Sequence, residues 1–351
     1  MENGGSVQPG RLRRQWNRLA DVVDGSLRKK IKAHFLYLEV THRCNLRCIS
    51  CYTGAGSEKP DSLTLEERKS VVRQAKAMGV RSVSLSGSGE PLLYPDLGEL
   101  IAYIRSLGMS VVLFTNGTLL TPEIARFLLE RQVVTYVKLF SLEPQVVDRL
   151  VGRQNAYHWV DYVDPRSDDL RSVKIPQGLK HLLDAWEQMG RPDLVRAEAL
   201  IARINSPSLP EVARFCRRLG IGFYLETPVF TGRALEHMEE LAMDQQGYRA
   251  LFEELEAIQG AEALQGARVA QCPVEKNPAV WTNGDLALCS CRSARVGNVR
   301  EGSLQRLYRK ARKLRRLETR RLAKDSSQGD YFRRCNARKL YEERHNLPCD
   351  Y

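Results

Sequence analysis

The chain has 351 residues, of which 54 are Lys or Arg and 42 are Asp or Glu, so its formal net charge is +12. It contains no run of about 18 apolar residues, which excludes a membrane-spanning helix. The opening residues Met-Glu-Asn-Gly-Gly-Ser lack the apolar core of a secretory signal, and the nine cysteines then favour metal binding in a reducing compartment over disulfides. We therefore expect a cytoplasmic protein with one large α/β domain and one smaller domain.

Much of the positive charge lies in two runs, residues 11–18 and 309–321. Residues 1–33, which include the first run, are expected to form a basic lead-in. Leucines recur around the second run at near-helical spacing, which predicts an amphipathic helix. A solvated basic face is the simplest interpretation, and an acidic redox partner, an anionic substrate and nucleic acid are the alternatives. Nucleic acid is disfavoured because no further basic run and no recognition fold accompany these two.

The first predicted strand, residues 35–40, leads directly into Cys44, Cys48 and Cys51, which have the spacing C-x3-C-x2-C. Three thiolates on one loop can bind three irons of a [4Fe–4S] cluster and leave the fourth iron open to a ligand. Zinc is the alternative, because thiolates also suit zinc. Zinc would need a fourth ligand, and His42, two residues before the first cysteine, has no typical finger spacing.

Strands then alternate with helices, the first of which has Thr64 as N-cap and Glu67 as its capping-box partner. This alternation predicts an α/β fold in which parallel strands are joined by helical crossovers, and five or six such units form a partial barrel. The loops after the strands lie at the edge where α/β barrels carry their chemistry. The expected strands lie near residues 35–40, 81–86, 110–115, 133–140, 195–203 and 221–227, and the expected helices near 64–78, 96–107, 122–131, 176–190 and 208–219.

Three charged residues, Lys138, Glu198 and Glu226, lie within apolar strand patterns. A charge that points into a barrel is costly unless it is paired or used. Lys138 and Glu226 are therefore candidates for a catalytic acid or base, ahead of Glu198.

An aromatic and acidic insertion, residues 152–175, follows the fourth strand. It is either a surface loop or a lid over the working face, in which case His158 and Asp161 are candidate substrate contacts. After the last strand, Arg233 could bind an anionic group.

Five cysteines follow residue 270, and the segment 280–289 between them predicts a β-hairpin with a two-residue turn at Asn283-Gly284. Because a hairpin brings its ends together, Cys272 and Cys289 could bind the same metal. The five are Cys272, Cys289, Cys291, Cys335 and Cys349.

These motifs resemble the radical S-adenosylmethionine (SAM) superfamily, strongly over about residues 34–230 and more weakly over 270–350. The resemblance implies a (β/α)6 TIM-like partial barrel. Ser88-Gly89-Glu90 resembles the Gly-Gly-Glu motif of the family, in which the glutamate accepts a hydrogen bond from the SAM ammonium. The usual aromatic residue before the third cysteine is replaced by Ser50, so Tyr52 is the candidate for adenine stacking. The implied SAM contacts are Tyr52, Ser88, Gly89, Glu90, Asn116, Ser141, Arg203 and Asn205.

In this family a reduced [4Fe–4S] cluster splits SAM, and the resulting 5′-deoxyadenosyl radical removes a hydrogen atom from the substrate. A flavodoxin or ferredoxin is the expected electron donor. The C-terminal cysteines are similar to the SPASM/twitch extension, and five are too few for its two-cluster form. The resemblance therefore implies one auxiliary [4Fe–4S] cluster, with Cys291 either exchanging with Cys289 or acting as a hydrogen donor. The implied ligands are Cys272, Cys289, Cys335 and Cys349.

The expected substrate is a polyhydroxylated small molecule, such as a sugar, aminocyclitol or nucleoside, that undergoes oxidation, epimerisation, dehydration or decarboxylation. The alternative within enzymes is a peptide-modifying maturase. It is disfavoured because only about 33 residues precede the first strand, too few for a leader-binding domain. A non-catalytic iron–sulfur electron carrier is the alternative of another class, and it would not need the Ser88-Gly89-Glu90 motif. The expected domains are the lead-in 1–33, the barrel 34–235 and a twitch-like domain 236–351.

Overall fold

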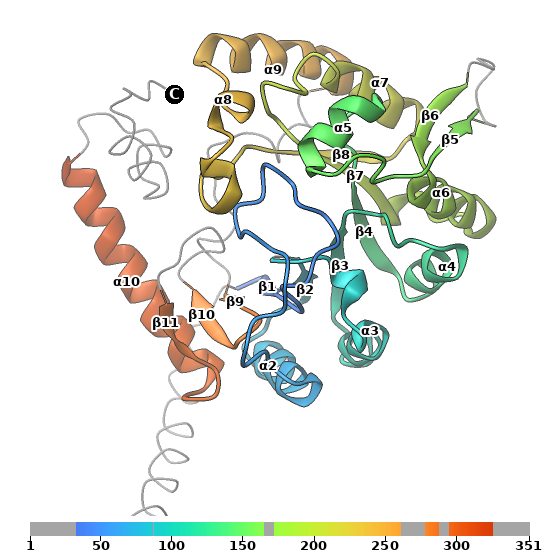
Figure 1. Cartoon of the computed structure of the whole chain (residues 1–351). Helices are drawn as coiled ribbons and strands as arrows, with labels where there is room; N and C mark the ends of the chain where they lie inside the picture. The colour runs from blue at the N-terminus through green and yellow to red at the C-terminus, as the bar shows by residue number, and fades with distance from the viewer. Residues whose placement is uncertain (1–32, 87, 165–171, 261–277, 288–294, 326–351) are drawn as a thin grey trace, which may run out of the picture.

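In the computed structural model, residues 33–86, 88–164, 172–260, 278–287 and 295–325 are described. Six parallel strands form the central sheet in the order β1-β2-β3-β4-β7-β8, and helical segments connect them (Figure 1). This arrangement confirms the α/β partial barrel. The strands are β1 (Phe35–Leu38), β2 (Ser82–Leu85), β3 (Ser110–Thr115), β4 (Val133–Lys138), β7 (Val195–Leu200) and β8 (Gly222–Glu226).

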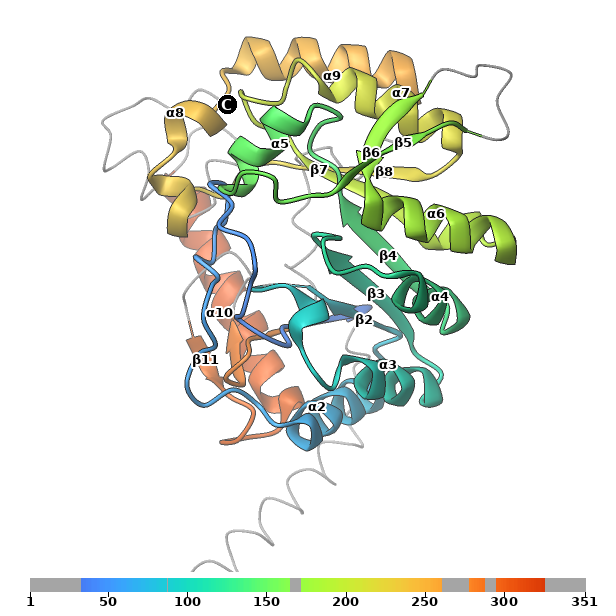
Figure 2. The same ribbon diagram turned by 45° about the vertical axis from the view of Figure 1, so that its right-hand side comes forward.

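Helices cover the convex face of this sheet, and Figure 2 shows them outside the curve of the strands. The first, α2, begins with the predicted capping box, in which Thr64 and Glu67 bond to each other's main chain. The helices are α2 (Leu65–Ala77), α3 (Leu97–Ser106), α4 (Pro122–Glu130), α5 (Pro144–Val151), α6 (Gln177–Met189), α7 (Leu209–Leu219), α8 (Met238–Leu241), α9 (Gln245–Gln259) and α10 (Leu304–Asp325), with short 3-10 turns η1 (Pro91–Leu93), η2 (Pro192–Leu194) and η3 (Gly232–Leu235).

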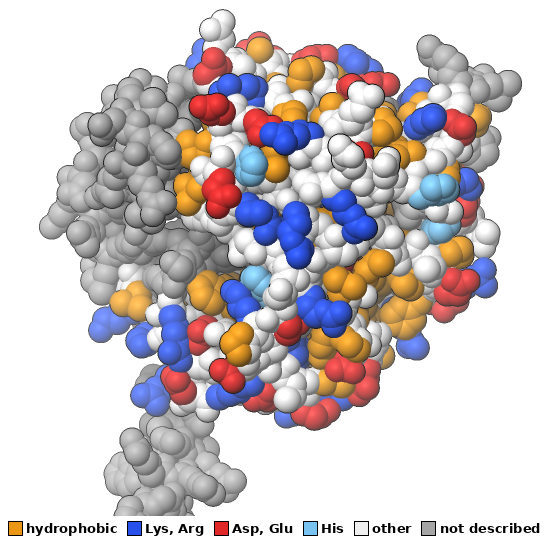
Figure 3. Space-filling view, in the orientation of Figure 1, with side chains coloured by type: hydrophobic (Ala, Val, Ile, Leu, Met, Phe, Trp, Pro, Cys, Tyr) orange, Lys and Arg blue, Asp and Glu red, His pale blue; other side chains and the backbone are white. Residues whose placement is uncertain are grey.

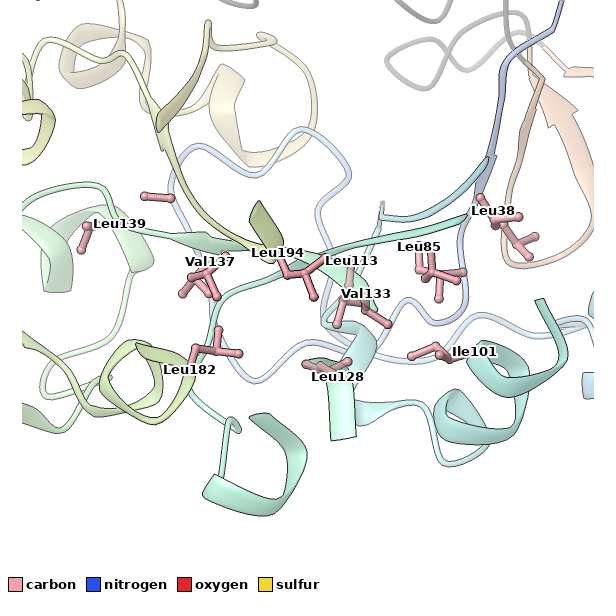
Figure 4. Packing of buried hydrophobic residues seen from close by; sticks show 14 of the residues in the cluster. Leu38, Leu85, Ile101, Leu113, Leu128, Val133, Val137, Leu139, Leu182 and Leu194 are labelled. Atoms are coloured by element: carbon pink, nitrogen blue, oxygen red, sulfur yellow. The ribbon is translucent and has the colours of Figure 1, made fainter. Parts of the chain in front are cut away.

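The core lies between the strands and these helices. In β4, Val133 and Val137 are buried against Leu128 of α4 and Leu182 of α6 (Figure 4). Because side chains alternate across a strand, Lys138 and its even-numbered neighbours point to the concave side instead. The helix-facing residues thus hold the sheet together, and the opposite face is left for polar side chains.

Two predicted boundaries differ from the structure. The fifth parallel strand ends at Leu200 rather than near residue 203, and Asn205 lies in the turn that precedes α7. The insertion is not only a loop, because β5 (Trp159–Tyr162) and β6 (Val173–Pro176) form a small antiparallel sheet. Tyr162 of this sheet packs edge-on against Phe215 of α7, with ring centroids 6.3 Å apart, and this contact attaches the insertion to the barrel.

The C-terminal hairpin is joined to the barrel sheet. Strand β9 (Ala279–Val280) pairs in parallel with β1, and β10 (Asp285–Ala287) and β11 (Arg295–Asn298) continue the sheet in antiparallel order. The predicted hairpin is confirmed, but Val280 pairs with Leu286, so five residues rather than two lie between the paired positions. In this loop Gly284 has φ +87° and donates to the carbonyl of Trp281.

Helix α10 contains the second basic run and buries Leu304, Leu307 and Tyr308 against the rest of the fold. This confirms an amphipathic helix over its described side chains. No helix among the described residues is long and apolar enough to cross a membrane.

Candidate active site

The cysteine loop follows β1 and closes on itself. Cys44 N–H donates to the carbonyl of Gly56 at 3.1 Å, and Gly56 N–H donates to that of His42 at 3.0 Å. Within the loop, Cys51 N–H donates to the carbonyl of Cys48 at 3.1 Å, so a tight turn joins the last two cysteines. The sequence spacing thus produces a compact loop at the carboxyl end of the first strand.

The end of α5 holds one side of this loop. Arg47 N–H and Ile49 N–H donate to the carbonyls of Val151 and Leu150, at 3.0 and 2.9 Å. Gly152, which ends the helix with φ +63°, lies so close that a Cβ atom there would be 2.2 Å from the carbonyl oxygen of Arg47. The close approach and the left-handed backbone both require glycine.

The segment 231–233 holds the other side. Arg233 donates through its guanidinium to the carbonyls of Cys48 at 3.1 Å and Ala55 at 3.0 Å, and its N–H donates to that of Cys51 at 3.0 Å. Thr231 Oγ1 donates to the carbonyl of Tyr52 at 3.0 Å. Arg233 therefore has a structural role, because its nitrogens bind the cysteine loop itself, and its binding of an anionic group stays a prediction.

The three thiols are free and partly buried. Burial raises the pKa of Cys48 to about 12 and shifts that of Cys44 in the same direction, whereas the positive charges of Lys138 and Arg233 act on Cys48 in the opposite sense. No three His, Cys, Asp or Glu side chains among the described residues are placed to hold a single metal ion. Soft sulfur donors spread over one loop fit a multi-iron cluster, which carries positive charge to stabilise the thiolates.

Basic side chains surround this loop on the outer face. Figure 3 shows Lys and Arg side chains gathered over the middle of the face that carries the cysteine loop in Figure 1. Arg47 donates to the carbonyls of Cys44 and Leu46, both at 3.0 Å, and Arg153 donates to that of Asn45 at 3.2 Å. These arginines therefore support the loop while leaving positive charge at its surface.

The Ser-Gly-Glu segment lies directly beside the cysteine loop. A Cβ atom on Gly89 would be 2.2 Å from the carbonyl oxygen of Arg43, and this carbonyl accepts from Glu90 N–H at 2.8 Å. Glu90 is buried, and burial raises its pKa. Its carboxylate accepts from Thr115 Oγ1 at 2.6 Å and from Asn116 N–H at 2.7 Å. The site is thus built from the ends of β1, β2 and β3 together.

Asn116 connects the third strand to the cysteine loop, because its Nδ2 donates to Asn45 Oδ1 at 2.9 Å. Tyr157 of the insertion donates its hydroxyl to the carbonyl of Asn116 at 2.9 Å. Burial raises the pKa of Tyr157 well above its usual value, so the phenol keeps its proton. We did not predict Tyr157 from the sequence, and the unusual density of aromatic residues in the insertion was the available signal.

Glu39 is a second residue that the sequence did not reveal. Its carboxylate accepts from Ser88 Oγ and from Thr282 N–H, the latter at 3.4 Å. One carboxylate therefore joins the predicted SAM-binding segment to the C-terminal hairpin. Burial raises the pKa of Glu39 to about 7.

This pKa predicts a pH-dependent stability. Between about pH 4.5 and 7 the unfolded chain loses the proton of Glu39 and the folded chain keeps it, so the free energy of unfolding falls by up to about 3 kcal/mol as the pH rises, and then levels off. Glu39→Gln should remove this fall and keep an acceptor for Ser88. Infrared titration of the carboxyl groups should lose one signal near pH 7 in the variant. A control variant of the exposed Glu211 should retain it, and a Glu39 that titrates near 4.5 would contradict the prediction.

Three of the residues predicted to contact SAM have side chains that form hydrogen bonds with main-chain atoms. Asn205 is fully buried, with Nδ2 donating to the carbonyls of Phe140 and Leu200, both at 2.8 Å, and Oδ1 accepting from Ala202 N–H at 2.9 Å. It therefore holds the turn after β7. Ser141 Oγ accepts from Glu143 N–H at 3.0 Å, and Arg203 Nε donates to the carbonyl of Ala242 at 2.9 Å. Contact of these three residues with SAM, like that of Tyr52, stays a prediction.

The other candidates divide into three groups. Lys138, Glu198 and Glu226 come together on the concave side of the sheet, with Lys138 Nζ 2.5 Å from Glu198 Oε1 and 3.9 Å from Glu226 Oε2. His158 is exposed and pairs with Gln177, and Asp161 is exposed and accepts from Ser172, so both bond within or next to the insertion. The C-terminal candidates lie outside the described residues: Cys272, Cys289, Cys291, Cys335 and Cys349.

Comparison with known proteins identifies the barrel. Residues 38–163 match the model of the radical SAM superfamily. The chain is 38% identical over 113 residues to Fe-coproporphyrin III synthase of Methanosarcina barkeri, covering 29% of this chain and 28% of that protein. It is 29% identical over 191 residues to the tungsten-containing aldehyde ferredoxin oxidoreductase cofactor-modifying protein of Pyrococcus furiosus, covering 53% and 49%. It is 32% identical over 115 residues to the mycofactocin maturase MftC of Mycobacterium tuberculosis, covering 32% and 29%. The chain thus spans about half or less of the length of these relatives.

Two solved structures share the fold. Streptococcus suis SuiB bound to the precursor peptide SuiA has a TM-score of 0.61 at 16% identity, over 88% of this chain and 71% of SuiB. Native anSMEcpe with bound AdoMet and Cp18Cys peptide has a TM-score of 0.55 at 14% identity, over 86% of this chain and 88% of that chain. The family match spans the cysteine loop, the Ser-Gly-Glu segment and Asn116, which the fold brings together at one edge of the sheet. The part of the chain that forms this site, residues 38–163, therefore matches the radical SAM superfamily, whose members use a [4Fe–4S] cluster and SAM.

Proposed function

We propose that this chain binds a [4Fe–4S] cluster through Cys44, Cys48 and Cys51, binds SAM beside it, and modifies a peptide. The observation that carries the proposal is the convergence of three free thiols, the buried Glu90 and Asn116 at the carboxyl ends of neighbouring strands. When bound, the cluster and SAM supply a 5′-deoxyadenosyl radical that takes a hydrogen atom from the substrate.

The protein's own part is positioning. Arg233 and the end of α5 hold the cysteine loop from two sides, which fixes the direction of the thiols. Glu90 offers a buried carboxylate that suits the ammonium group of SAM, and the buried Tyr157 of the insertion donates to the carbonyl of Asn116 and so helps to hold that residue in place. Burial of these groups keeps water away from a reactive intermediate.

The substrate proposal departs from the expected small molecule. The relatives include the mycofactocin maturase MftC and the antilisterial bacteriocin subtilosin biosynthesis protein AlbA of Bacillus subtilis, 29% identical over 121 residues. Both structural neighbours were solved with peptides. These findings support the peptide-modifying alternative better than a polyhydroxylated small molecule. The short segment before the first strand does not exclude a peptide substrate, because a leader-binding domain can be a separate chain.

A small-molecule substrate remains the second candidate. It is favoured by the Pyrococcus furiosus relative, which aligns over 191 residues and is named a cofactor-modifying protein. A flavodoxin or ferredoxin is the proposed electron donor in either case.

The function can be tested with anaerobically reconstituted enzyme, SAM and a chemical reductant. We expect 5′-deoxyadenosine to form slowly without substrate and faster with a short peptide encoded beside this gene, and the peptide mass should change. A Cys48→Ala enzyme with the same peptide is the control. Acceleration by a peptide-free metabolite fraction, with none by the peptide, would favour the second candidate, and no 5′-deoxyadenosine under any condition would reject the function.

The auxiliary cluster makes a separate prediction. Two cubane clusters require about eight irons per chain, and we propose that the second is held by Cys272, Cys289, Cys335 and Cys349. Cys335→Ala should lower the iron content toward about four, whereas Cys291→Ala should leave it near eight if Cys291 is the spare thiol. Iron analysis and electron paramagnetic resonance measure both. A wild-type content near four irons would rule out the second cluster.

A further inference from the structure

Three charged side chains from adjacent strands meet on the concave side of the sheet. Lys138, the last residue of β4, is the register partner of Glu198 in β7, and Glu226 is the last residue of β8. Lys138 Nζ lies 2.5 Å from Glu198 Oε1 and 3.9 Å from Glu226 Oε2. Burial raises the pKa of Cys48 and of Glu90, and the positive charge of Lys138 opposes part of both shifts, so Lys138 lies within electrostatic reach of the cluster and SAM sites.

When both carboxyl groups are ionised, the charges of this group do not balance. Two carboxylates face one ammonium, and no other cationic side chain among the described residues forms an ion pair with either carboxylate. Glu198 is 1% exposed, and its second oxygen, Oε2, is buried without a hydrogen-bond partner. A buried hydrogen-bond acceptor without a donor is costly in free energy, so native structures seldom contain one unless a ligand, an ion or a water molecule binds there.

The two carboxylates also differ in access. Glu226 is 44% exposed and Lys138 is 28% exposed, whereas Glu198 is enclosed. A ligand that arrives from the strand ends would therefore meet Glu226 first and then reach the unpaired oxygen of Glu198. Burial raises the pKa of Glu198 to about 8, so without a ligand this carboxyl can keep a proton and share it with Glu226. An incoming cation could take the place of that proton.

Aromatic rings lie below this group, toward the beginning of the strands. Tyr136 and Tyr224 precede Lys138 and Glu226 by two residues and so share their face. Tyr136 stacks on Phe114 with centroids 4.6 Å apart and meets Tyr224 edge-on at 5.8 Å. Arg196 already lies over Tyr136, with its guanidinium carbon 5.6 Å from the centroid. Because these rings fill the space toward the beginning of the strands, a ligand would approach the three charged residues from the carboxyl ends of the strands.

We propose that Glu198 and Glu226, with Lys138 between them, form a subsite for an ammonium or guanidinium group of the substrate. This inference rests on the proposed function, because the subsite lies beside the proposed site of radical formation. A subsite of this kind would select substrates that carry an amine, such as peptides with a basic side chain. An anionic group would add to the negative excess. A neutral hydroxyl could donate to Glu198 but would leave the excess charge uncompensated.

The test uses the reconstituted full chain with SAM bound, and hexylamine as the probe, with 1-hexanol as its neutral match. Saturation-transfer NMR and calorimetry measure binding. Hexylamine should bind saturably and at least about ten-fold more tightly than hexanol, since about 1.4 kcal/mol of charge pairing corresponds to that factor. Glu226→Gln and Glu198→Gln should each abolish this preference, and Glu211→Gln, on the outer surface of α7, should keep it.

Formation of 5′-deoxyadenosine without substrate separates this inference from the proposed function. If the wild type and Glu211→Gln both form it, the proposed function stands. The iron content and SAM affinity of Glu226→Gln then report on its cluster and SAM sites, and where both match the wild type a lost amine preference belongs to the subsite. Because Glu226 is 44% exposed, its replacement should not prevent folding, and Glu226→Gln tests the proposal even if Glu198→Gln fails to fold. Equal binding of hexylamine and hexanol, no hexylamine binding to the wild type, or an unchanged preference in Glu226→Gln would each overturn the proposal.

Discussion

Cys48→Ala is expected to reduce SAM cleavage to the level found without protein. The thiol of Cys48 lies on the turn that joins it to Cys51, and the guanidinium of Arg233 holds its carbonyl. No other described cysteine is available to replace it, because Cys216 is buried in α7. A cluster with two protein ligands on this loop would be lost or would no longer be fixed beside Glu90. The production of 5′-deoxyadenosine under anaerobic reducing conditions measures the effect.

Cys216→Ala is the matched control for this experiment, because it makes the same chemical change away from the site. Its side chain is fully buried among apolar neighbours, so the cost is one of packing, and stability should fall by about 1–2 kcal/mol without loss of cleavage. Retained cleavage in Cys48→Ala would defeat the assignment of the cluster to this loop.

Gly152→Ala is expected to give the second large effect, through a contact rather than through a ligand. An alanine Cβ would lie 2.2 Å from the carbonyl oxygen of Arg47, so the cysteine loop or the end of α5 would have to move by about 1 Å. Displacements of that size in positioned groups can lower a rate by about 100-fold. We expect iron retention by the loop to fall and SAM cleavage to drop by at least about ten-fold.

Gly190→Ala provides the control for backbone strain. Gly190 ends α6 with φ +64°, nearly the same as the +63° of Gly152, but nothing lies within 4 Å of its Cβ position. Both variants therefore carry a similar left-handed cost of about 1–2 kcal/mol, and only Gly152→Ala presses on the cysteine loop. Similar iron content and activity in the two variants would show that the contact with Arg47 does not position the cluster.

Features that depend on residues close together in the sequence, or on a repeating pattern of apolar residues, could be predicted without the structure. The cysteine loop, the capping box of α2 and the succession of strands and helices depend on interactions within a few residues, or on the period of apolar side chains. The partial barrel followed from that succession, because parallel strands require crossovers. The strand that ends at Leu200 was placed too long, since the apolar pattern continues into the following turn.

Contacts between segments that are distant in the sequence could not be predicted from it. Arg233 binds the carbonyl of Cys48 across 185 residues, and Glu39 meets Thr282 N–H across 243. Nothing in the local pattern distinguishes such residues from ordinary surface or strand positions, because their roles depend on which carbonyl or amide the fold brings to them. The same applies to the imbalance of charge around Lys138. The sequence by itself determined which chemistry the chain can carry, through thiols at a fixed spacing, and only the tertiary structure decided which distant groups hold those thiols and what the neighbouring charges can receive.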